Sequence, residues 1–420
     1  MLGSQTMIAY VGRILIIAGM LAFLLNYSLE NLYGINGYLV GAFLTSAGVL
    51  LSRKREFYSR QFTLYLALMI ATCLFHLLSG GLSKGFFEAF LCYVVFPSMA
   101  YLVSFEETEQ DFIIKFVALT GLISFAGSLL FYVNIFFGLG QLGVIFDLEF
   151  TQTMGALQVK NTSIYGSSLV SGVVALVQAS CCALLIKKGY SNLWWLVFFL
   201  CVATLFASLS RRAMIPFALV LFFLMQDLRV TQKRNVALFA ILGFGTIAYL
   251  VPGVGSAILN RFVSVFDLGS TFEGGNASRL QAIWFGITQV AANPLGTGFG
   301  SLSSIGKERD ALLSGEEIEG FLGVTESFYV TVVGEVGLLQ CFFIALIFVG
   351  KYREIFKDLR WRFVFLPLLV ESIMGLGFLN PIISLFSLMC VMPEIRKNRA
   401  RENLKDGLNA EANKQPTTAN

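Results

Sequence analysis

Long apolar runs recur along most of this 420-residue chain, and they limit what it can fold into more than any other feature. The runs are about 18 to 22 residues long, which is enough for a helix to cross the roughly 30 Å hydrocarbon core of a bilayer. Hydrophobic residues make up 56% of the chain, charged residues make up 13%, and the mean hydropathy is +0.74. The sequence therefore predicts an all-α, polytopic membrane protein.

Hydropathy and flanking charge together predict about twelve membrane-spanning helices. They are expected at residues 7–27, 34–51, 61–79, 86–104, 112–137, 166–186, 193–210, 213–226, 236–252, 327–350, 363–379 and 381–393. The first run continues past Leu25 without a small-residue cleavage site, so we interpret it as a signal anchor. The chain is thus divided into spans at 1–251, a large loop with helical segments at 252–326, further spans at 327–393 and a tail at 394–420.

Lysine and arginine gather on one side of this predicted topology, which marks that side as cytoplasmic. The residues concerned are Arg53, Lys54, Arg55, Arg60, Lys187, Lys188, Arg229, Lys233, Arg234 and the stretch Lys351–Arg362. Both termini fall on that side, whereas the segment Gly138–Tyr165 and the loop 252–326 fall on the opposite, outer side. The net charge of +4 therefore describes topology and does not indicate nucleic-acid binding.

Cysteine and histidine usage excludes several kinds of site. The cysteines all lie in apolar runs, which argues against disulfides and thiolate metal sites and favours a packing role. They are Cys73, Cys92, Cys181, Cys182, Cys201, Cys341 and Cys390. The single histidine, His76, is expected to be a satisfied side chain within an apolar run, which excludes His-cluster metal chemistry and a Ser-His-Asp site built from loop residues. Neither a metal nor a cofactor is predicted.

Two arginines break the charge pattern on the outer side. Arg211 and Arg212 sit in a very short turn between hydrophobic helices, where arginine is costly and usually has a partner. An anionic ligand is one such partner. Lipid phosphates, reached by snorkelling side chains, are the alternative.

The long loop carries a third arginine, Arg279, at a predicted helix start. Asn276-Ala277-Ser278 can cap this helix, which has an apolar stripe including Trp284 and ends near Asn293-Pro294. A cation in a first turn is unfavourable beside the positive end of the helix dipole, and a bound anion would reconcile the two. Alternatively, this is an amphipathic surface helix with Arg279 paired to an acid of the same loop.

Two acids flank the end of the loop and the next apolar run. Glu326 lies at the predicted outer boundary and Glu335 lies nine residues further on. Such an acid can pair with an arginine or accept a proton from a hydroxyl, and the deeper Glu335 favours the structural role. The glycines of Gly296-Thr297-Gly298 are expected to allow a tight return of the loop toward the membrane, since neither a preceding strand nor a helix opening supports a dinucleotide site.

The order and sidedness of these motifs resemble the bacterial O-antigen polymerase and O-antigen ligase superfamily of polytopic glycosyltransferases. The motifs are Ser208-Leu209-Ser210-Arg211-Arg212-Ala213, Arg279 with Trp284, Asn293-Pro294-Leu295-Gly296-Thr297-Gly298, Glu326-Ser327-Phe328-Tyr329 and Glu335-Val336-Gly337. The resemblance covers about Ser208 to Gly337. Ligases of this superfamily commonly carry His-Asn where this chain has Glu326-Ser327, so the polymerase is favoured.

The resemblance implies a fold like that of GT-C glycosyltransferases and a place in the bacterial inner membrane, with the long loop in the periplasm. Its expected partners are an undecaprenyl-diphosphate-linked glycan donor and acceptor, membrane lipid and a polysaccharide chain-length regulator, without nucleic acid. Arg211 and Arg279 are expected to stabilise the diphosphate and Glu326 to deprotonate or orient the acceptor hydroxyl. The expected substrate-binding residues are Ser210, Arg212, Trp284, Ser327, Tyr329 and Glu335.

Three other functions fit some of these features. A ligase would transfer the finished polymer to lipid A-core. A transporter or flippase for lipid-linked sugars would also use intramembrane charges and glycine breaks, although no internal repeat is visible. A membrane scaffold for polysaccharide assembly would tolerate loss of the arginines and glutamates.

Overall fold

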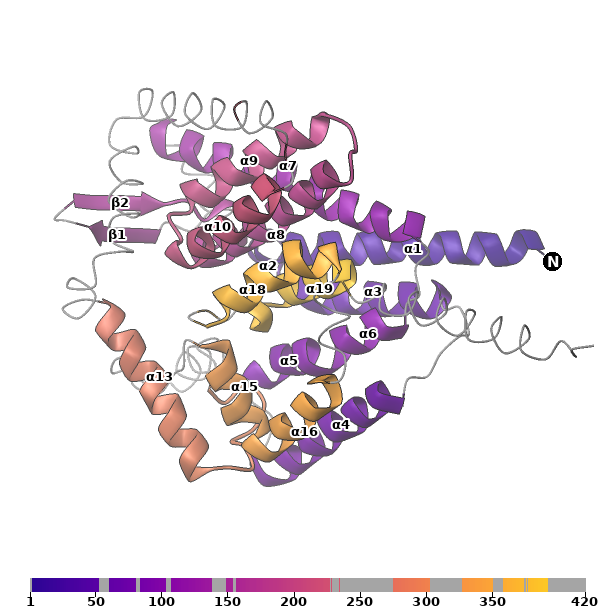
Figure 1. Cartoon of the computed structure of the whole chain (residues 1–420), viewed down its shortest axis with the longest axis vertical. Helices are drawn as coiled ribbons and strands as arrows, with labels where there is room; N and C mark the ends of the chain where they lie inside the picture. Colours follow the sequence, from indigo (N-terminus) through magenta and orange to yellow (C-terminus); the bar gives the residue numbers. More distant parts are fainter. Residues whose placement is uncertain are drawn as a thin grey trace, which may run out of the picture.

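The computed structural model describes residues 2–52, 60–80, 84–102, 107–137, 149–153, 156–226, 228, 234, 275–302, 327–349, 358–373, 375 and 377–391. The described part is mainly helical, as predicted (Figure 1). The predicted span 236–252, Glu326 and the tail 394–420 lie outside the described residues. So does most of the long loop, apart from its segment 275–302.

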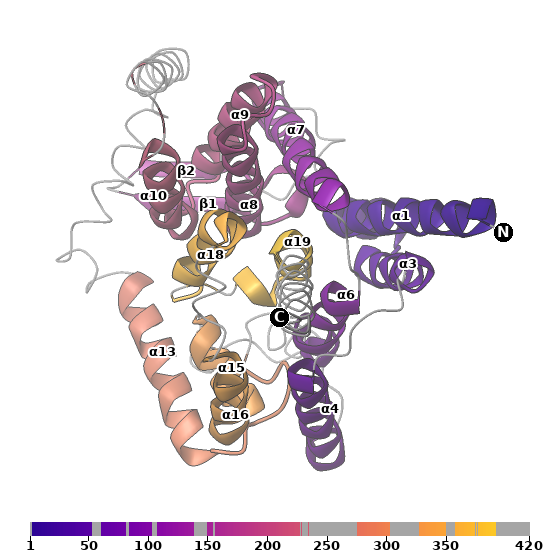
Figure 2. The ribbon, with the colours of Figure 1, turned by 45° about the vertical axis from the view of Figure 1, so that its right-hand side comes forward.

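The N-terminal region is a closely packed helical hairpin. Helix α1 (Leu2–Leu24) is followed, after a bend of 71°, by α2 (Asn26–Tyr33), and α3 (Gly37–Ser52) returns alongside α1 (Figures 1 and 2). A Cβ atom at Gly19 would lie 2.8 Å from the carbonyl oxygen of Gly41, so the two backbones approach as closely as glycine allows. Such small-residue contacts are typical of helix pairs in membranes.

The next segment brings in two long helices and an interrupted one. Helix α4 covers Arg60–Gly80, α5 covers Lys84–Phe90, the π-helix η1 covers Leu91–Val95, α6 covers Phe96–Leu102 and α7 covers Glu107–Phe137. A π-helical turn shifts the side chains that follow it and often occurs at functional sites. Here it contains Tyr93, a residue of the candidate site described below.

A small β-hairpin accompanies the helices of this otherwise all-α fold. Strand β1 (Glu149–Thr153) pairs antiparallel with β2 (Ala156–Lys160), with Glu149 opposite Lys160 and Thr153 opposite Ala156. It belongs to the predicted outer segment and lies at the end of the molecule away from the N-terminus (Figure 1). Threonine, phenylalanine and valine favour strands, and this polar segment is too short and too polar to span a bilayer.

Helix α8 is the centre of the helical core. It covers Ser168–Lys187, follows the short 3₁₀ helix η3 (Ser163–Tyr165), and packs against α7, α9 (Leu193–Ala207) and α10 (Arg211–Gln226). Most of its residues are buried, including Gln178, whose amide nitrogen donates to Thr120 Oγ1 (3.0 Å) and Ser124 Oγ (2.9 Å) of α7. The amide nitrogen of Gln178 therefore has two partners inside an apolar core.

The C-terminal part is made of shorter helices than predicted. They are α13 (Gly275–Ala292), α15 (Phe328–Val336), α16 (Leu338–Val349), the π-helix η4 (Trp361–Phe365), α18 (Leu366–Glu371), the 3₁₀ helix η5 (Gly377–Leu379) and α19 (Pro381–Val391). The predicted span 327–350 is broken at Gly337, and the predicted span 363–379 leaves helical structure after Glu371. Helix α19 has 11 residues, or about 16 Å at 1.5 Å per residue, which is about half of a bilayer core.

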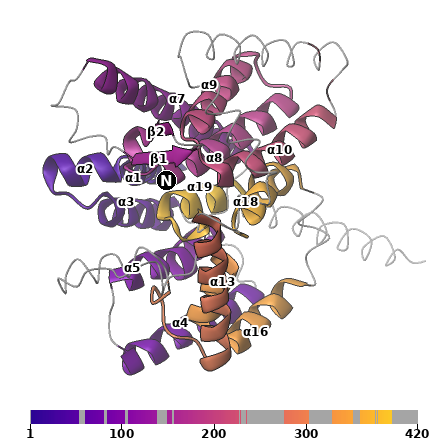
Figure 3. The same cartoon turned by 90° about the vertical axis from the view of Figure 1, so that its left-hand side faces the viewer.

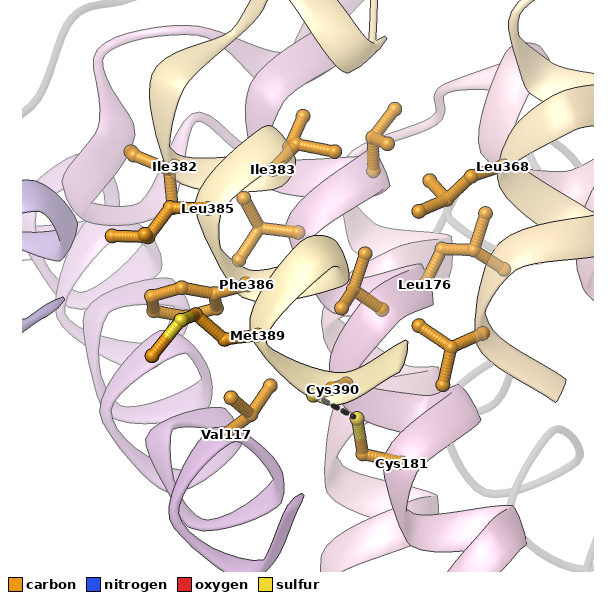
Figure 4. Close-up of a cluster of buried hydrophobic side chains, with 14 of the residues drawn as sticks. Val117, Leu176, Cys181, Leu368, Ile382, Ile383, Leu385, Phe386, Met389 and Cys390 are labelled. Atoms are coloured by element: carbon orange, nitrogen blue, oxygen red, sulfur yellow. Dashed lines mark hydrogen bonds between the residues drawn. The ribbon is translucent and has the colours of Figure 1, made fainter. Parts of the chain in front are cut away.

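Helix α19 packs into the core next to α8. Figure 4 shows Phe386 and Met389 of α19 beside Val117 of α7, and Cys390 beside Cys181 of α8. The two sulfur atoms are 3.7 Å apart, and all the cysteines of the chain are free thiols, mostly buried. The cysteines therefore act as small apolar packing residues, as the sequence indicated.

A cluster of charged and polar side chains lies at the predicted cytoplasmic end of the core. Lys188 Nζ lies 2.6 Å from Asp111 Oδ1, and the Tyr190 hydroxyl donates to Asp111 Oδ2 at 2.5 Å. The buried Arg360 donates from Nη1 to Gln110 Oε1. Side chains from three segments of the chain are thus joined at one end of α7.

The described helices indicate a membrane protein. Two of them, Gln110–Ile135 and Ser168–Lys187, are long and apolar enough to span a bilayer, and the bent α1–α2 pair gives a third. Large apolar side chains also point outward, among them Phe43 and Leu78. Apolar surface of this kind is stable against lipid and unfavourable against water.

Candidate functional site

The turn before α10 presents two arginines at a helix start. Ala213 and Met214 donate their backbone N–H groups to the Ser210 carbonyl, both at 3.1 Å, which makes Ser210 the residue that opens α10. Leu209 has a φ of 52°, a strained value for leucine. Arg211 and Arg212 are thus the first residues of α10. Arg212 is half-buried, and the Arg211 side chain lies outside the described part of the structure.

Helix α8 is shaped to receive this turn. A Cβ atom at Gly172 would lie 2.7 Å from both Ser208 Oγ and Ser210 Cβ, so a larger residue would push the turn away. The Ser208 hydroxyl donates to the Leu205 carbonyl at 2.6 Å and accepts the Ser210 N–H at 3.3 Å. The start of α10 is therefore fixed by the core, and the helix dipole adds positive potential near the two arginines.

Helix α13 exists and ends where the sequence predicts, but it starts earlier. It begins at Gly275, so Ser278 lies inside the helix and is not its cap, and Arg279 lies just beyond the first turn. The dipole effect is weaker there, because it falls off within one turn. Helical spacing places position 279 on the same face as Gly286 and Val290, whereas Trp284 is on the opposite face with 67% of its surface exposed.

Two of the motifs that carry the family resemblance contact each other. The backbone N–H of Thr297 donates to the Gly334 carbonyl (2.8 Å) and that of Gly298 to the Glu335 carbonyl (3.2 Å). The Leu338 N–H donates to the Pro294 carbonyl at 2.8 Å. The loop after α13 therefore pairs with the backbone groups that the break between α15 and α16 exposes.

Glycine is required on both sides of this contact. Gly296 and Gly337 have φ values of 94° and 105°, in the region that other residues avoid. A Cβ atom at Gly337 would lie 2.6 Å from the Leu295 carbonyl oxygen. The expected tight return of the loop is thus present, and its target is the broken helix.

Glu335 holds the same contact from inside. It is fully buried, and its carboxylate accepts the Leu302 N–H at Oε1 (3.1 Å) and the Tyr93 hydroxyl at Oε2 (3.1 Å). Phe299 packs edge-on against Tyr93, with ring centroids 5.3 Å apart, and lies 6.3 Å from the ring of His76. Glu335 therefore ties the loop to η1, which agrees with the structural role and places it away from the surface.

Ser327 and Tyr329 are also engaged by the protein itself. The carbonyl of the buried Ser327 accepts the Thr331 N–H at 2.9 Å, and the Tyr329 hydroxyl donates to the Leu369 carbonyl at 2.9 Å. Between them, Phe328 N–H donates to the Ser372 carbonyl at 3.1 Å. These residues position the start of α15 against the end of α18, immediately after Glu326.

Two buried acids were not singled out from the sequence. Glu88 of α5 and Glu371 of α18 are both nearly fully buried. A Cβ atom at Gly375 would lie 1.8 Å from Glu371 Oε1, so this carboxylate packs against the turn that contacts Phe328. An acid inside an apolar run was the available signal, because such residues are rare and usually functional.

Among the described residues, no three His, Cys, Asp or Glu side chains are grouped so as to hold a metal ion.

No protein-family model matches the chain, and a search of curated proteins finds none that matches it.

Proposed function

We propose that the protein is a bacterial inner-membrane glycosyltransferase with about twelve spans and a GT-C-like arrangement. It would polymerise undecaprenyl-diphosphate-linked oligosaccharide repeat units of O-antigen, or of a related surface polysaccharide, at the periplasmic face. The observation that carries the proposal is the contact of Thr297 and Gly298 with Gly334 and Glu335, because it joins two motifs of the polymerase and ligase superfamily.

The reaction needs no metal or nucleotide sugar. The acceptor hydroxyl oxygen attacks the anomeric carbon of the donor, the bond from that carbon to the diphosphate oxygen breaks, and the lipid diphosphate leaves as an anion. Arg211 and Arg279 would stabilise its growing negative charge. Glu326 would take the hydroxyl proton, with inversion at the anomeric carbon as the simplest outcome.

The test is complementation of a polymerase-deficient strain with Arg211→Ala, Arg279→Ala or Glu326→Gln. Each variant is expected to lose at least about 100-fold of long-chain product, since one electrostatic contact to a developing charge is worth that much. Single-repeat product should rise accordingly on a polysaccharide gel. Arg234→Ala, at an exposed position of the predicted cytoplasmic side, is the control. Normal laddering by all three variants at wild-type protein levels rejects the proposed site.

The same gel separates the ligase. If the protein were a ligase, the inactive variants would lose all lipid-A-linked repeats and accumulate polymer on the lipid carrier. The departure at Glu326-Ser327 from the His-Asn of ligases favours the polymerase.

A transporter for lipid-linked sugars is a second candidate, because one structural feature favours it. Interrupted helices with buried acids are typical of translocation paths, and here α15–α16 is broken beside the buried Glu335. Purified protein in vesicles that moves a labelled carrier lipid across the membrane, without forming a glycosidic bond, would establish this function instead.

A further inference from the structure

Helix α13 has one face packed on the protein and one face left open. On the packed face, Gly286 is buried, and Val290 Cγ2 lies 3.7 Å from the position that a Cβ atom at Gly334 would occupy. On the open face, Trp284 is 67% exposed and Ile287 is 45% exposed. Leu295, just beyond the helix, continues this face at 50% exposure.

The open face is uncharged and mostly apolar, with Thr288 as an exposed polar residue beside Trp284 and Ile287. Helix α13 contains one ionisable residue, Arg279, which helical spacing places on the opposite face. A helix exposed to water normally carries charged residues on its outer side. Water is therefore a poor solvent for the face that Trp284, Ile287 and Leu295 form, and an apolar surface should cover it.

The neighbouring surface identifies that covering as lipid. Helix α13 packs on α15, and the next helix, α16, exposes Leu338, Leu339, Phe342 and Phe343. The open face of α13 thus continues into a helix whose outer side suits the acyl chains of a bilayer. Tryptophan is the residue most typical of the boundary between lipid headgroups and acyl chains.

The orientation of α13 fits this position. Figures 1 and 2 show α13 running crosswise to α1, and Figure 3 shows it lying across the end of the molecule that also carries the β-hairpin. Helices that lie in the membrane interface run parallel to its plane, whereas spanning helices such as α1 cross it.

We propose that α13 is an interfacial membrane helix whose Trp284 face is immersed in phospholipid. A face of this kind sinks about 5–10 Å into the boundary between headgroups and acyl chains. The long loop would then be held against the bilayer surface, with position 279 turned toward the protein at the level of the lipid phosphates. This assignment does not depend on the chemistry that the protein catalyses.

The test is tryptophan fluorescence of the full-length protein in phosphatidylcholine–phosphatidylglycerol vesicles. The signal of Trp284 is obtained as the difference between the wild type and Trp284→Phe. Replacing phosphatidylcholine by a form brominated near the headgroup end of its acyl chains should reduce this difference signal about two-fold, as expected for a ring at that depth. Aqueous iodide should leave it unchanged.

The other results overturn the proposal. Quenching by iodide but not by brominated lipid would place Trp284 in water, and protection from both quenchers would mean that a protein covers the face. Trp361→Phe is the matched control, because Trp361 is buried and its difference signal should be insensitive to iodide.

Discussion

Helix α8 and the pair α15–α16 come from apolar runs that hydropathy does not distinguish, yet they fold differently. Helix α8 is a single helix of 20 residues with most of its residues buried. The second run is divided at Gly337 into helices of 9 and 12 residues. Both regions contain a buried polar side chain, Gln178 in one and Glu335 in the other.

The difference lies in how backbone groups are satisfied. In α8 the helix pairs its own backbone groups, and the Gln178 amide nitrogen finds its two partners on another helix, α7. In α15–α16 the carbonyls of Gly334 and Glu335 need outside donors, and the loop supplies Thr297 and Gly298. Because an unpaired backbone group in an apolar region costs several kcal/mol, the break and the loop stabilise each other. The helix is thus discontinuous at Gly337, and the loop that carries Thr297 and Gly298 is held in a fixed position.

The largest effect is expected from Gly337→Ala, because Gly337 is the residue at which α15 and α16 are separated. The substitution forces alanine into a φ of 105° and places its Cβ 2.6 Å from the Leu295 carbonyl oxygen. The free energy of unfolding in detergent should fall by about 3 kcal/mol or more. Gly189→Ala is the matched control, because Gly189 also has a positive φ of 76° but has open space around it. It should cost about 1 kcal/mol, and equal losses in both variants would show that the loop contact is unimportant.

A smaller loss is expected from Glu335→Leu, which leaves the Leu302 N–H and the Tyr93 hydroxyl without their shared acceptor. Unsatisfied buried donors make a cost of about 2–3 kcal/mol reasonable, against about 1 kcal/mol for Tyr93→Phe. The two changes should not add in the double variant, because both remove the same hydrogen bond. Full additivity in thermal unfolding would contradict the contact between the two side chains.

The sequence predicts the continuous helices better than the broken one. The expected spans 112–137 and 166–186 correspond closely to α7 and α8, because their apolar runs are uninterrupted. The break at Gly337 was missed because it depends on a loop that lies far upstream in the sequence. The hairpin at Glu149–Lys160 was missed because hydropathy reports burial and not strand pairing.

In the candidate site, too, features set by the local sequence were easier to predict than those set by contacts between distant segments. The end of α13 near Asn293 follows from local turn chemistry and agrees with the prediction, whereas α10 begins at Arg211, two residues before the expected span 213–226. The burial of Glu335 by Tyr93 and the packing of Glu371 against Gly375 depend on tertiary contacts between distant segments, which no local pattern contains.

The hydrogen bonds from Gln178 of α8 to α7 should contribute less to the free energy of unfolding than the contact at Gly337. Gln178→Leu removes two hydrogen bonds to α7, and such bonds between membrane helices are worth about 0.6 kcal/mol each on average. We expect a loss of about 1 kcal/mol in the free energy of unfolding. Ser180→Ala is the control on the same helix, because the buried Ser180 Oγ has no hydrogen-bond partner among the described residues and should be dispensable. A loss from Gln178→Leu as large as that from Gly337→Ala would remove the distinction between the two helices.

The smallest effect is expected from Asp111→Asn, at the end of the same core that is predicted to be cytoplasmic. The substitution keeps an acceptor for the Tyr190 hydroxyl and removes the charge that faces Lys188 Nζ at 2.6 Å. Lys188 is partly exposed and Asp111 is nearly buried, with 23% and 12% of their side-chain surfaces accessible, so the pair should contribute about 0.5–1 kcal/mol. Raising the salt concentration to about 1 M shortens the screening length to about 3 Å. The difference in unfolding temperature between the wild type and Asp111→Asn should therefore become smaller. Glu30→Gln is the control, because Glu30 is an exposed acid of α2 with no ion pair among the described side chains. It should unfold at the same temperature as the wild type at either salt concentration. A loss at Asp111 that does not change with salt would mean that its hydrogen bonds, and not its charge, hold this end of α7 and α8 together.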